Sequence, residues 1–205
     1  MIFWQEVGRV AAGIYACDEA DALTLGALHL QVVYGDADAG VPAHLQSCLH
    51  EYVPNHIKPA RKPREWAEEL MWTHSRMVGF PRVMCMQNYV RMMGKFPAFG
   101  YTLFPVSQSH LGDGASPRVL LGVGCEDMIF LSRTYDRLQT ITYMDIAATT
   151  ALTPRRLLLE LEAGDKITLQ CAAGVGTECS ALVDIYSASQ AARKRRRNKA
   201  AATAN

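Results

Sequence analysis

Residues 155–186 read RRLLLELEAGDKITLQCAAGVGTECSALVDIY and contain two strand patterns followed by one helix pattern. In KITLQC (166–171) apolar and polar residues alternate, which is typical of a strand with one buried face. Apolar residues then recur every three or four positions, as expected of an amphipathic helix. This stripe consists of Cys179, Leu182, Val183 and Tyr186. The segment therefore predicts the end of an antiparallel sheet followed by a helix that packs on it.

Upstream of this segment, from Tyr101 onward, short β-rich runs alternate with turn residues. The expected strands are YTLFPVS, RVLLGV, DMIFLS, LQTITYM, DIAATTA, RRLLLELE and KITLQCA, and the expected turns are HLGDGASP, GCED, TYDR, ALTP and EAGD. An open antiparallel barrel has a gap at one corner, which an amphipathic helix can close while supplying part of the core. The second half of the chain is therefore expected to be a seven-stranded β-sandwich with a C-terminal capping helix.

The first half, up to about Met93, has helical periodicity. One stripe is Leu25, Leu28, His29 and Val32, with Thr24 or Asp21 as the expected cap and Gly35 and Asp36 as the end. Two further stripes are Trp66, Leu70, Met71, His74 and Met77, stopped by Gly79, and Val83, Met86, Val90 and Met93, opened by Pro81. Prolines at 54, 59 and 63 predict a loop, and Gly94, Pro97 and Gly100 a linker. The fold class is thus α+β.

Composition narrows the class of protein. The 205 residues are 49% apolar and 20% charged with a net charge of +1, which is ordinary for a globular protein and gives no global field that favours nucleic acid. The six cysteines form no C-x-x-C pair, and free, reduced thiols in a cytosolic protein are expected. We expect no signal peptide and no membrane span, because the start acquires charges at once and no apolar run is long enough.

Four segments resemble the FERM domain in order and spacing. LGALHLQVVYGD (25–36) is similar to a second-lobe helix ending Q-V-E-Y-G-D, and FPAFGYTLFPV (96–106) to the junction that opens the third lobe. SPRVLLGVGCEDMIFLS (116–132) resembles the strand pair that follows, and LLLELEAGDKITLQCAAGVGTECSALVDIY (157–186) the closing strands and helix. The resemblance implies a helical, acyl-CoA-binding-protein-like lobe over 1–94, a PH/PTB-like lobe over 95–193 and a basic disordered tail over 194–205. The ubiquitin-like first lobe is expected to be missing.

Within that family, residues 50–79 look most like the tails of unconventional myosins, which carry a similar Y-L-P … W … H-x-x-x-x-G arrangement. The resemblance implies a non-enzymatic module of a cytoskeletal motor tail, in the cytoplasm at the cytoskeleton or cell cortex. Its partners would be cytoplasmic peptides of cargo or membrane proteins and a phosphoinositide-containing membrane surface. The alternatives are a free-standing adaptor that links membrane proteins to the actin cortex and a kinesin-type tail.

The resemblance also implies a binding edge. In PTB-like folds a peptide adds as a strand to the fifth strand and packs on the C-terminal helix. The corresponding residues are Asp145, Ile146, Ala147, Ala148, Thr149, Val183, Ser187 and Gln190. Many FERM third lobes carry a Trp near the position of Thr149, so close ligand analogies do not transfer. The alternative is that Ile146 and Val183 belong to the core and that nothing uses the edge.

A basic run near the C-terminus is the second candidate site. It contains Arg193, Lys194, Arg195, Arg196 and Arg197. These cations would bind anionic lipid, with a solvated tail and a nuclear or nucleic-acid signal as alternatives. No aromatic residues interleave with them, which argues against single-strand stacking.

Other chemistry finds little support. His44, Cys48, His50 and His56 lack the tight pairs of a structural zinc site, so no metal or cofactor is expected. The G-x-G of GVGCED lies between two strands and predicts a hairpin turn rather than a dinucleotide loop. Cys125 with a distant histidine forms no recognisable catalytic set, so no enzymatic activity is expected.

Overall fold

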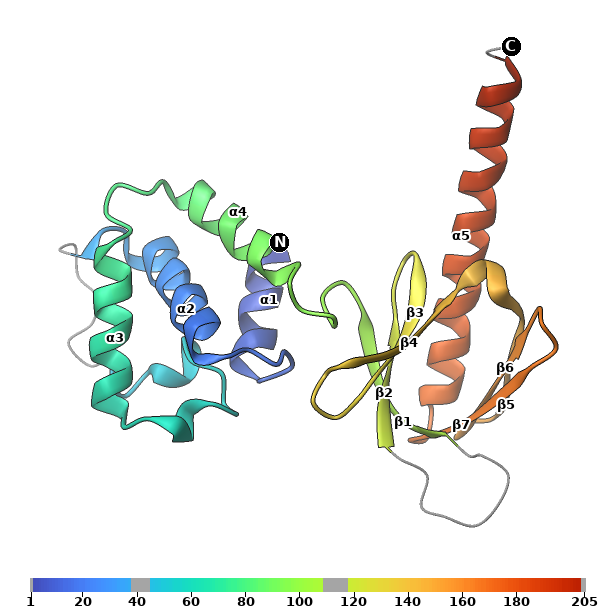
Figure 1. The fold of residues 1–205 in the computed structure, drawn as a ribbon, viewed down its shortest axis with the longest axis horizontal. Helices are drawn as coiled ribbons and strands as arrows, with labels where there is room; N and C mark the ends of the chain where they lie inside the picture. Colours follow the sequence, from blue (N-terminus) through green and yellow to red (C-terminus); the bar gives the residue numbers. More distant parts are fainter. Residues whose placement is uncertain (1, 38–44, 109–117, 204–205) are drawn as a thin grey trace. The chain divides into compact units, whose positions relative to one another are not determined.

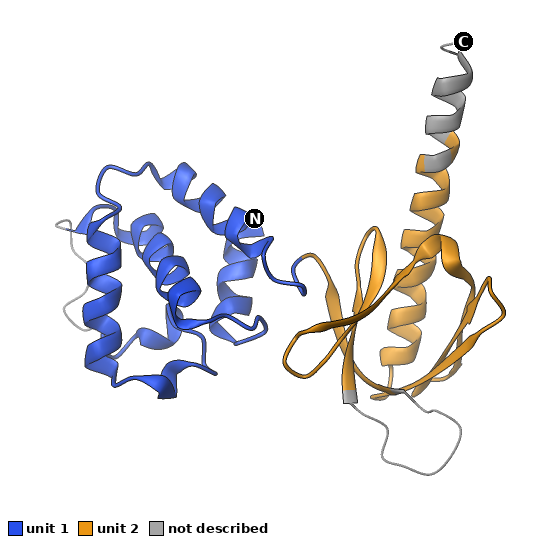
Figure 2. Cartoon of the chain, viewed as in Figure 1, with its two compact units in different colours: residues 1–99 blue, residues 100–205 orange. Residues whose placement is uncertain are grey.

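The computed structural model describes residues 2–37, 45–108 and 118–203 and divides the chain into two compact units (Figure 2). Unit 1 is Met1–Phe99 and unit 2 is Gly100–Asn205, so the boundary follows Phe99 rather than Gly94. The predicted turn HLGDGASP and His44 lie outside the described residues.

Unit 1 is a helical lobe built around α2 (Glu19–Tyr34), which contacts both α3 and α4. Every residue from Leu25 to Val32 is buried, so this helix is enclosed on all sides. The surrounding elements are α1 (Ile2–Ala11), η2 (Leu49–Glu51), η3 (Lys58–Ala60), α3 (Pro63–Ser75) and α4 (Arg82–Met93). The helical half of the prediction is confirmed.

The helix starts differ from the sequence-based expectation. Asp18 caps α2, because its side chain accepts a hydrogen bond from the backbone N–H of Asp21 at 2.7 Å. Thr24 instead donates from its hydroxyl to the carbonyl of Ala20, a bond inside the helix. Pro81 is the residue before α4 rather than part of its first turn. Helix α1 was not predicted at all.

Unit 2 contains the expected seven strands and C-terminal helix. They are β1 (Thr102–Gln108), β2 (Arg118–Val123), β3 (Asp127–Leu131), β4 (Arg137–Thr142), β5 (Ile146–Thr153), β6 (Arg156–Leu161), β7 (Lys166–Cys171) and α5 (Val175–Thr203). All neighbours pair antiparallel in the order β4-β3-β2-β1-β7-β6-β5, which leaves β4 and β5 at the edges. GVGCED forms the β2–β3 hairpin turn, as predicted.

The seven-stranded sheet bends so that its two halves face one core, with α5 across the opening (Figure 1). Phe104, Leu121 and Phe130 from one half share this core with Leu157, Leu159 and Leu169 from the other. Cys179 and Val183 of α5 are each 1% exposed and complete it. The helix therefore supplies part of the sandwich core, as its apolar stripe predicts.

Helix α5 is longer than expected. It runs to Thr203, so residues 194–203 of the segment that was expected to be a disordered tail are helical. Ala, Arg and Lys are all strong helix formers, so the basic run can extend a helix that has already been nucleated on the sheet.

Candidate functional site

Among the described residues, β5 is an edge strand that pairs with β6 alone. Its register shifts between Ile146 and Ala148 and again between Ala151 and Thr153, so two irregularities flank a regular central segment. The side chains from Ala147 to Ala151 are all alanine or threonine. A free edge with small side chains lets another backbone approach closely, which is what strand addition requires.

Helix α5 lies against this strand, with which it makes its most extensive contacts. A Cβ placed on Gly176 would lie 3.2 Å from the carbonyl oxygen of Thr153, so the start of α5 sits directly on the end of β5. At the other end of β5, the rings of Tyr143 and Tyr186 are 6.2 Å apart. The helix therefore runs beside the strand over its whole length.

The structure does not bring all the predicted groove residues together. Asp145 precedes the strand, because it closes the 3-10 turn η4 (Tyr143–Asp145) and accepts from the hydroxyl of Thr142 at 2.7 Å. Val183 is a core residue, as the alternative interpretation held. Gln190 donates from its amide to the carbonyl of Cys125 in the β2–β3 turn at 2.8 Å. Ile146, Ala147, Ala148 and Thr149 lie on β5, and Ser187 is half-buried on α5.

Two residues that the sequence analysis assigned only to the core stripe are further candidates for this surface. Leu182 and Tyr186 are partly buried, and both pack against the core cluster from its margin. Tyr186 faces Tyr143, the first residue of the η4 turn that leads into β5. The sequence shows that Leu182 and Tyr186 are four positions apart and so share one face of the helix. It does not show which face of α5 lies against β5.

The basic run extends α5 beyond the part that contacts the sheet. Arg193 and Arg195 are exposed, whereas the side chains of Lys194, Arg196 and Arg197 lie outside the described residues. Three residues before the run, the Gln190 amide donates to the carbonyl of Cys125 in the β2–β3 turn. The helix continues to Thr203, so these cations do not lie in its last turn.

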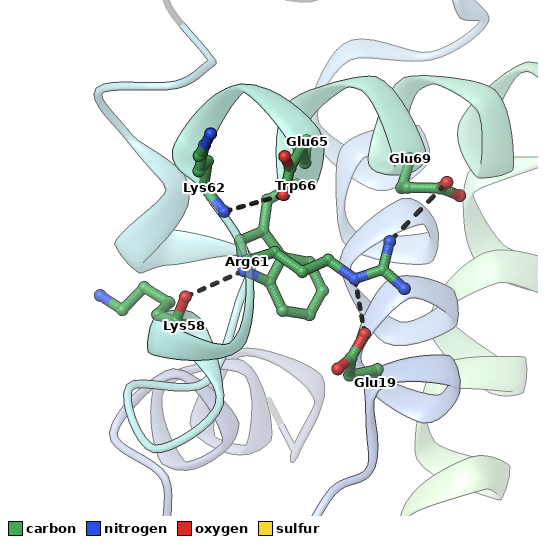
Figure 3. A network of polar contacts seen from close by, with 7 residues as sticks. All are labelled: Glu19, Lys58, Arg61, Lys62, Glu65, Trp66 and Glu69. Atoms are coloured by element: carbon green, nitrogen blue, oxygen red, sulfur yellow. Dashed lines mark hydrogen bonds and ion pairs between the residues drawn. The ribbon is translucent and has the colours of Figure 1, made fainter.

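A cavity of about 540 Å³ lies on the helical unit. Its lining residues are Gln46, Ser47, Leu49, His50, Lys58, Pro59, Arg61, Pro63 and Trp66. Figure 3 shows the polar network beside it, in which Arg61 donates to Glu19 at 2.6 Å and lies 3.7 Å from Glu69. The Trp66 indole donates to the carbonyl of Lys58 at 3.0 Å. Two carboxylates therefore already balance the Arg61 charge, and the network joins the starts of α2 and α3.

No metal centre is found in the described part of the chain, and the Cys171 and Cys179 thiols are not activated. That part of the chain holds no group of three or more His, Cys, Asp or Glu side chains suited to a metal ion. Burial raises the pKa of the Cys179 thiol to about 12 and also raises the pKa of Cys171, so both stay protonated near neutral pH. Unit 2 contains one histidine, His110, which is not among the described residues.

Comparison with known proteins identifies the family. The family model described as the FERM central domain matches residues 1–104, which is half of the chain. The chain belongs to the FERM family. Its seven-stranded sheet and capping helix correspond to the PH/PTB-like lobe of that family, and its helical unit to the central lobe.

Two solved FERM structures share this fold. The C-terminal MyTH4-FERM domain of human Myosin 7b, solved with the harmonin-a PDZ3 domain, is 17% identical with a TM-score of 0.74, over 92% of this chain and 38% of that one. The FERM domain of Drosophila Merlin, in complex with its C-terminal domain, is 13% identical with a TM-score of 0.72, over 96% and 65%.

A curated relative, FERM domain-containing protein B of Dictyostelium discoideum, is 24% identical over 72% of this chain. The chain spans 32% of the length of that protein and 5% of the length of the matching talin of Oscarella pearsei. No helix in the described ranges is both long enough and apolar enough to cross a membrane.

Proposed function

We propose that this FERM chain is a non-enzymatic binding module of a cytoskeletal, myosin-like motor tail. Its ligands are cytoplasmic peptides of cargo or membrane proteins, which add as a strand to the free edge of β5. The protein acts in the cytoplasm, at the cytoskeleton or the cell cortex. The observation that carries the proposal is the edge strand β5, paired on one side only and flanked along its length by α5.

Peptide recognition of this kind has a backbone part and a side-chain part, and β5 with the neighbouring face of α5 can supply both. Main-chain groups on the free edge supply hydrogen bonds, and side-chain pockets supply specificity. The small side chains of β5 leave the edge accessible, while Leu182 and Tyr186 offer a partly exposed apolar wall on α5. A peptide with an apolar residue facing α5 and extended backbone along β5 fits this arrangement.

A pair of proline substitutions tests strand addition. Thr149 and Thr150 are adjacent in the regular part of β5, opposite Leu159 and Leu158 of β6. In an antiparallel pair, the N–H groups of successive residues point alternately to the partner strand and away from it. One of Thr149→Pro and Thr150→Pro therefore removes a bond to β6, and the other removes only an N–H group on the free edge.

The test uses a peptide selected on the intact chain from a random display library. The proline that spares the β6 ladder should leave the melting temperature nearly unchanged and weaken the peptide by about tenfold or more. Tyr186→Ala should weaken it as well. Binding that survives both changes would rule out the β5 groove. Val183→Glu is unsuitable, because it would place a charge in the core.

We also propose that the basic end of α5, with Arg193, Lys194, Arg195, Arg196 and Arg197, binds anionic lipid. Each cation near such a surface contributes roughly 1 kcal/mol. Replacing all five by glutamine should reduce sedimentation with vesicles that contain phosphatidylinositol bisphosphate. Unchanged sedimentation would leave the run as a solvated helix end.

A free-standing FERM adaptor is the second candidate, favoured by the Dictyostelium relative, which is named for its FERM domain. It would link membrane proteins to the actin cortex by the same groove. Sequencing of the full-length transcript separates the two. An ATPase motor in the same reading frame supports the motor tail, whereas a ubiquitin-like lobe without a motor supports the adaptor.

A further inference from the structure

The connection between α3 and α4 is an exposed apolar arch. Residues 78–83, which read VGFPRV, complete this connection and begin α4, and all six are exposed. Val78 is 55%, Phe80 40% and Val83 64% exposed, and Trp72 on the last turns of α3 is 59% exposed. Single exposed apolar residues are common, but here four large ones lie within twelve positions of the chain. We call residues 76–83 together with Trp72 the α3–α4 arch.

Hydrogen bonds from α2 and from the residues that follow it hold the backbone of the arch in place. Met77 is 9% exposed, and the backbone N–H of Phe80 donates to its carbonyl at 3.0 Å. The backbone N–H of Gly79 donates to Asp36 at 2.8 Å, and the carbonyl of Phe80 accepts from the amide of Gln31 at 3.2 Å. These backbone groups keep their partners when the arch enters a less polar medium, which lowers the cost of transfer.

The charged side chains within the arch itself are cationic. Arg76 and Arg82 are both exposed, and no Asp or Glu occurs between residues 70 and 112 of the sequence. The Arg76 guanidinium lies 4.9 Å from the centre of the Trp72 ring. The nearby carboxylate of Asp36 already accepts hydrogen bonds from Gly79 and Gln31. The exposed side chains of the arch are therefore apolar or cationic.

We propose that the α3–α4 arch inserts its apolar side chains into the headgroup region of an anionic membrane, with Arg76 and Arg82 against the lipid phosphates. Aromatic residues favour the membrane–water interface, and cations near them are attracted by anionic lipid. This contact lies in the helical unit and is independent of the β5 groove and of the basic end of α5.

The exposed tryptophan reports the insertion directly. In a Trp4→Phe background, the remaining tryptophans are Trp66, 1% exposed, and Trp72, 59% exposed. Phosphatidylcholine vesicles containing phosphatidylserine should shift the Trp72 emission to the blue, and brominated acyl chains should quench it. Pure phosphatidylcholine should do so much less. The variant Val78→Ser/Phe80→Ser/Val83→Ser, in the same background, should reduce partitioning about tenfold or more, and Arg82→Glu by a similar factor.

Matched controls locate the contact. Leu138→Ser/Ile185→Ser removes two side chains of similar exposure, 58% and 61%, from unit 2 and should leave the Trp72 signal unchanged. Neutralising residues 193–197 can lower total sedimentation but should preserve quenching of Trp72, which separates the arch from the helix end. Absence of a shift or of quenching overturns the proposal. A soluble poly-glutamate peptide is the alternative ligand. If it shifts the Trp72 emission while brominated lipids do not quench that emission, the membrane proposal is overturned in favour of an acidic protein partner.

Discussion

His74 Nε2 lies 2.8 Å from Oε1 of Gln31 and 2.9 Å from the carbonyl oxygen of Gly35. Both neighbours are acceptors, so Nε2 carries the proton and is shared between them. The Gln31 amide nitrogen donates onward to Asp36 at 2.8 Å and to the carbonyl of Phe80 at 3.2 Å. One buried glutamine therefore connects α2 with α3 and with the α3–α4 arch.

Gln31→Leu should destabilise the chain strongly. The leucine fills a similar volume but leaves the Phe80 carbonyl without this donor and His74 with one acceptor fewer. Losing buried partners costs about 1–3 kcal/mol for each stranded group, so we expect a total loss of roughly 2–4 kcal/mol. Urea unfolding followed by far-UV circular dichroism measures it. Val33→Ala, on the same helix at 43% exposure, is the control and should cost less than about 0.5 kcal/mol.

The free energy of unfolding should fall as the pH is lowered through the range in which histidines titrate. Burial lowers the pKa of His29 from 6.5 to about 4, and burial also lowers the pKa of His74. Below pH 6.5 the unfolded chain binds protons that the folded chain does not, so stability is lost as the pH falls from 6.5 toward 4. His29 alone accounts for roughly 3 kcal/mol over this window.

Single-residue variants test whether His29 causes this pH dependence of stability. His29→Gln should flatten the curve of unfolding free energy against pH, because the titrating group is gone. Val33→Ala removes no titratable group and should leave the slope as it is in the parent. Equal slopes in the parent and in His29→Gln would show that His29 does not titrate abnormally in the folded chain.

Much of unit 2 could be predicted because its signals are local. The alternation in each strand and the stripe on α5 directly reflect which side chains enter the core. Helix α1 was missed because its buried face includes a charge. Glu6 is 6% exposed and pairs with Arg9 at 3.3 Å and with the hydroxyl of Tyr15. A buried glutamate interrupts the apolar stripe that would have indicated a helix.

Contacts between residues far apart in the sequence explain the other differences between the sequence-based expectation and the structure. The bond between Gln31 and His74 spans 43 residues of sequence, and no spacing rule connects two such positions. The same limit applies to the candidate groove. Tyr186 faces Tyr143 across 43 residues, so only the packed structure shows that this tyrosine, and not Gln190, lies beside the start of β5.

Alanine substitutions at two helical glycines should change the stability in opposite directions. In α2, a Cβ on Gly26 would lie 2.7 Å from Leu70 Cδ2 and 2.8 Å from the carbonyl oxygen of Tyr52, so backbone must shift. In α1, a Cβ on Gly8 would meet nothing within 4 Å. Gly26→Ala should therefore cost about 1–3 kcal/mol, while Gly8→Ala should add roughly 0.5–1 kcal/mol through helix propensity. Thermal unfolding of both variants tests the close packing of α2; a stabilised Gly26→Ala would contradict it.

Thr149→Val should stabilise unit 2 without altering its binding edge. The Thr149 hydroxyl is buried and has no hydrogen-bond partner among the described residues, although the residue lies on the central part of β5. Valine keeps the shape and the strand propensity and removes the unsatisfied group, which is worth about 1 kcal/mol or more. The melting temperature should rise, and Thr150→Val, at an exposed position, should change it little. Because the backbone of β5 is unchanged, a strand-adding peptide should bind Thr149→Val as tightly as the parent, whereas weaker binding would mean that the hydroxyl contacts the ligand.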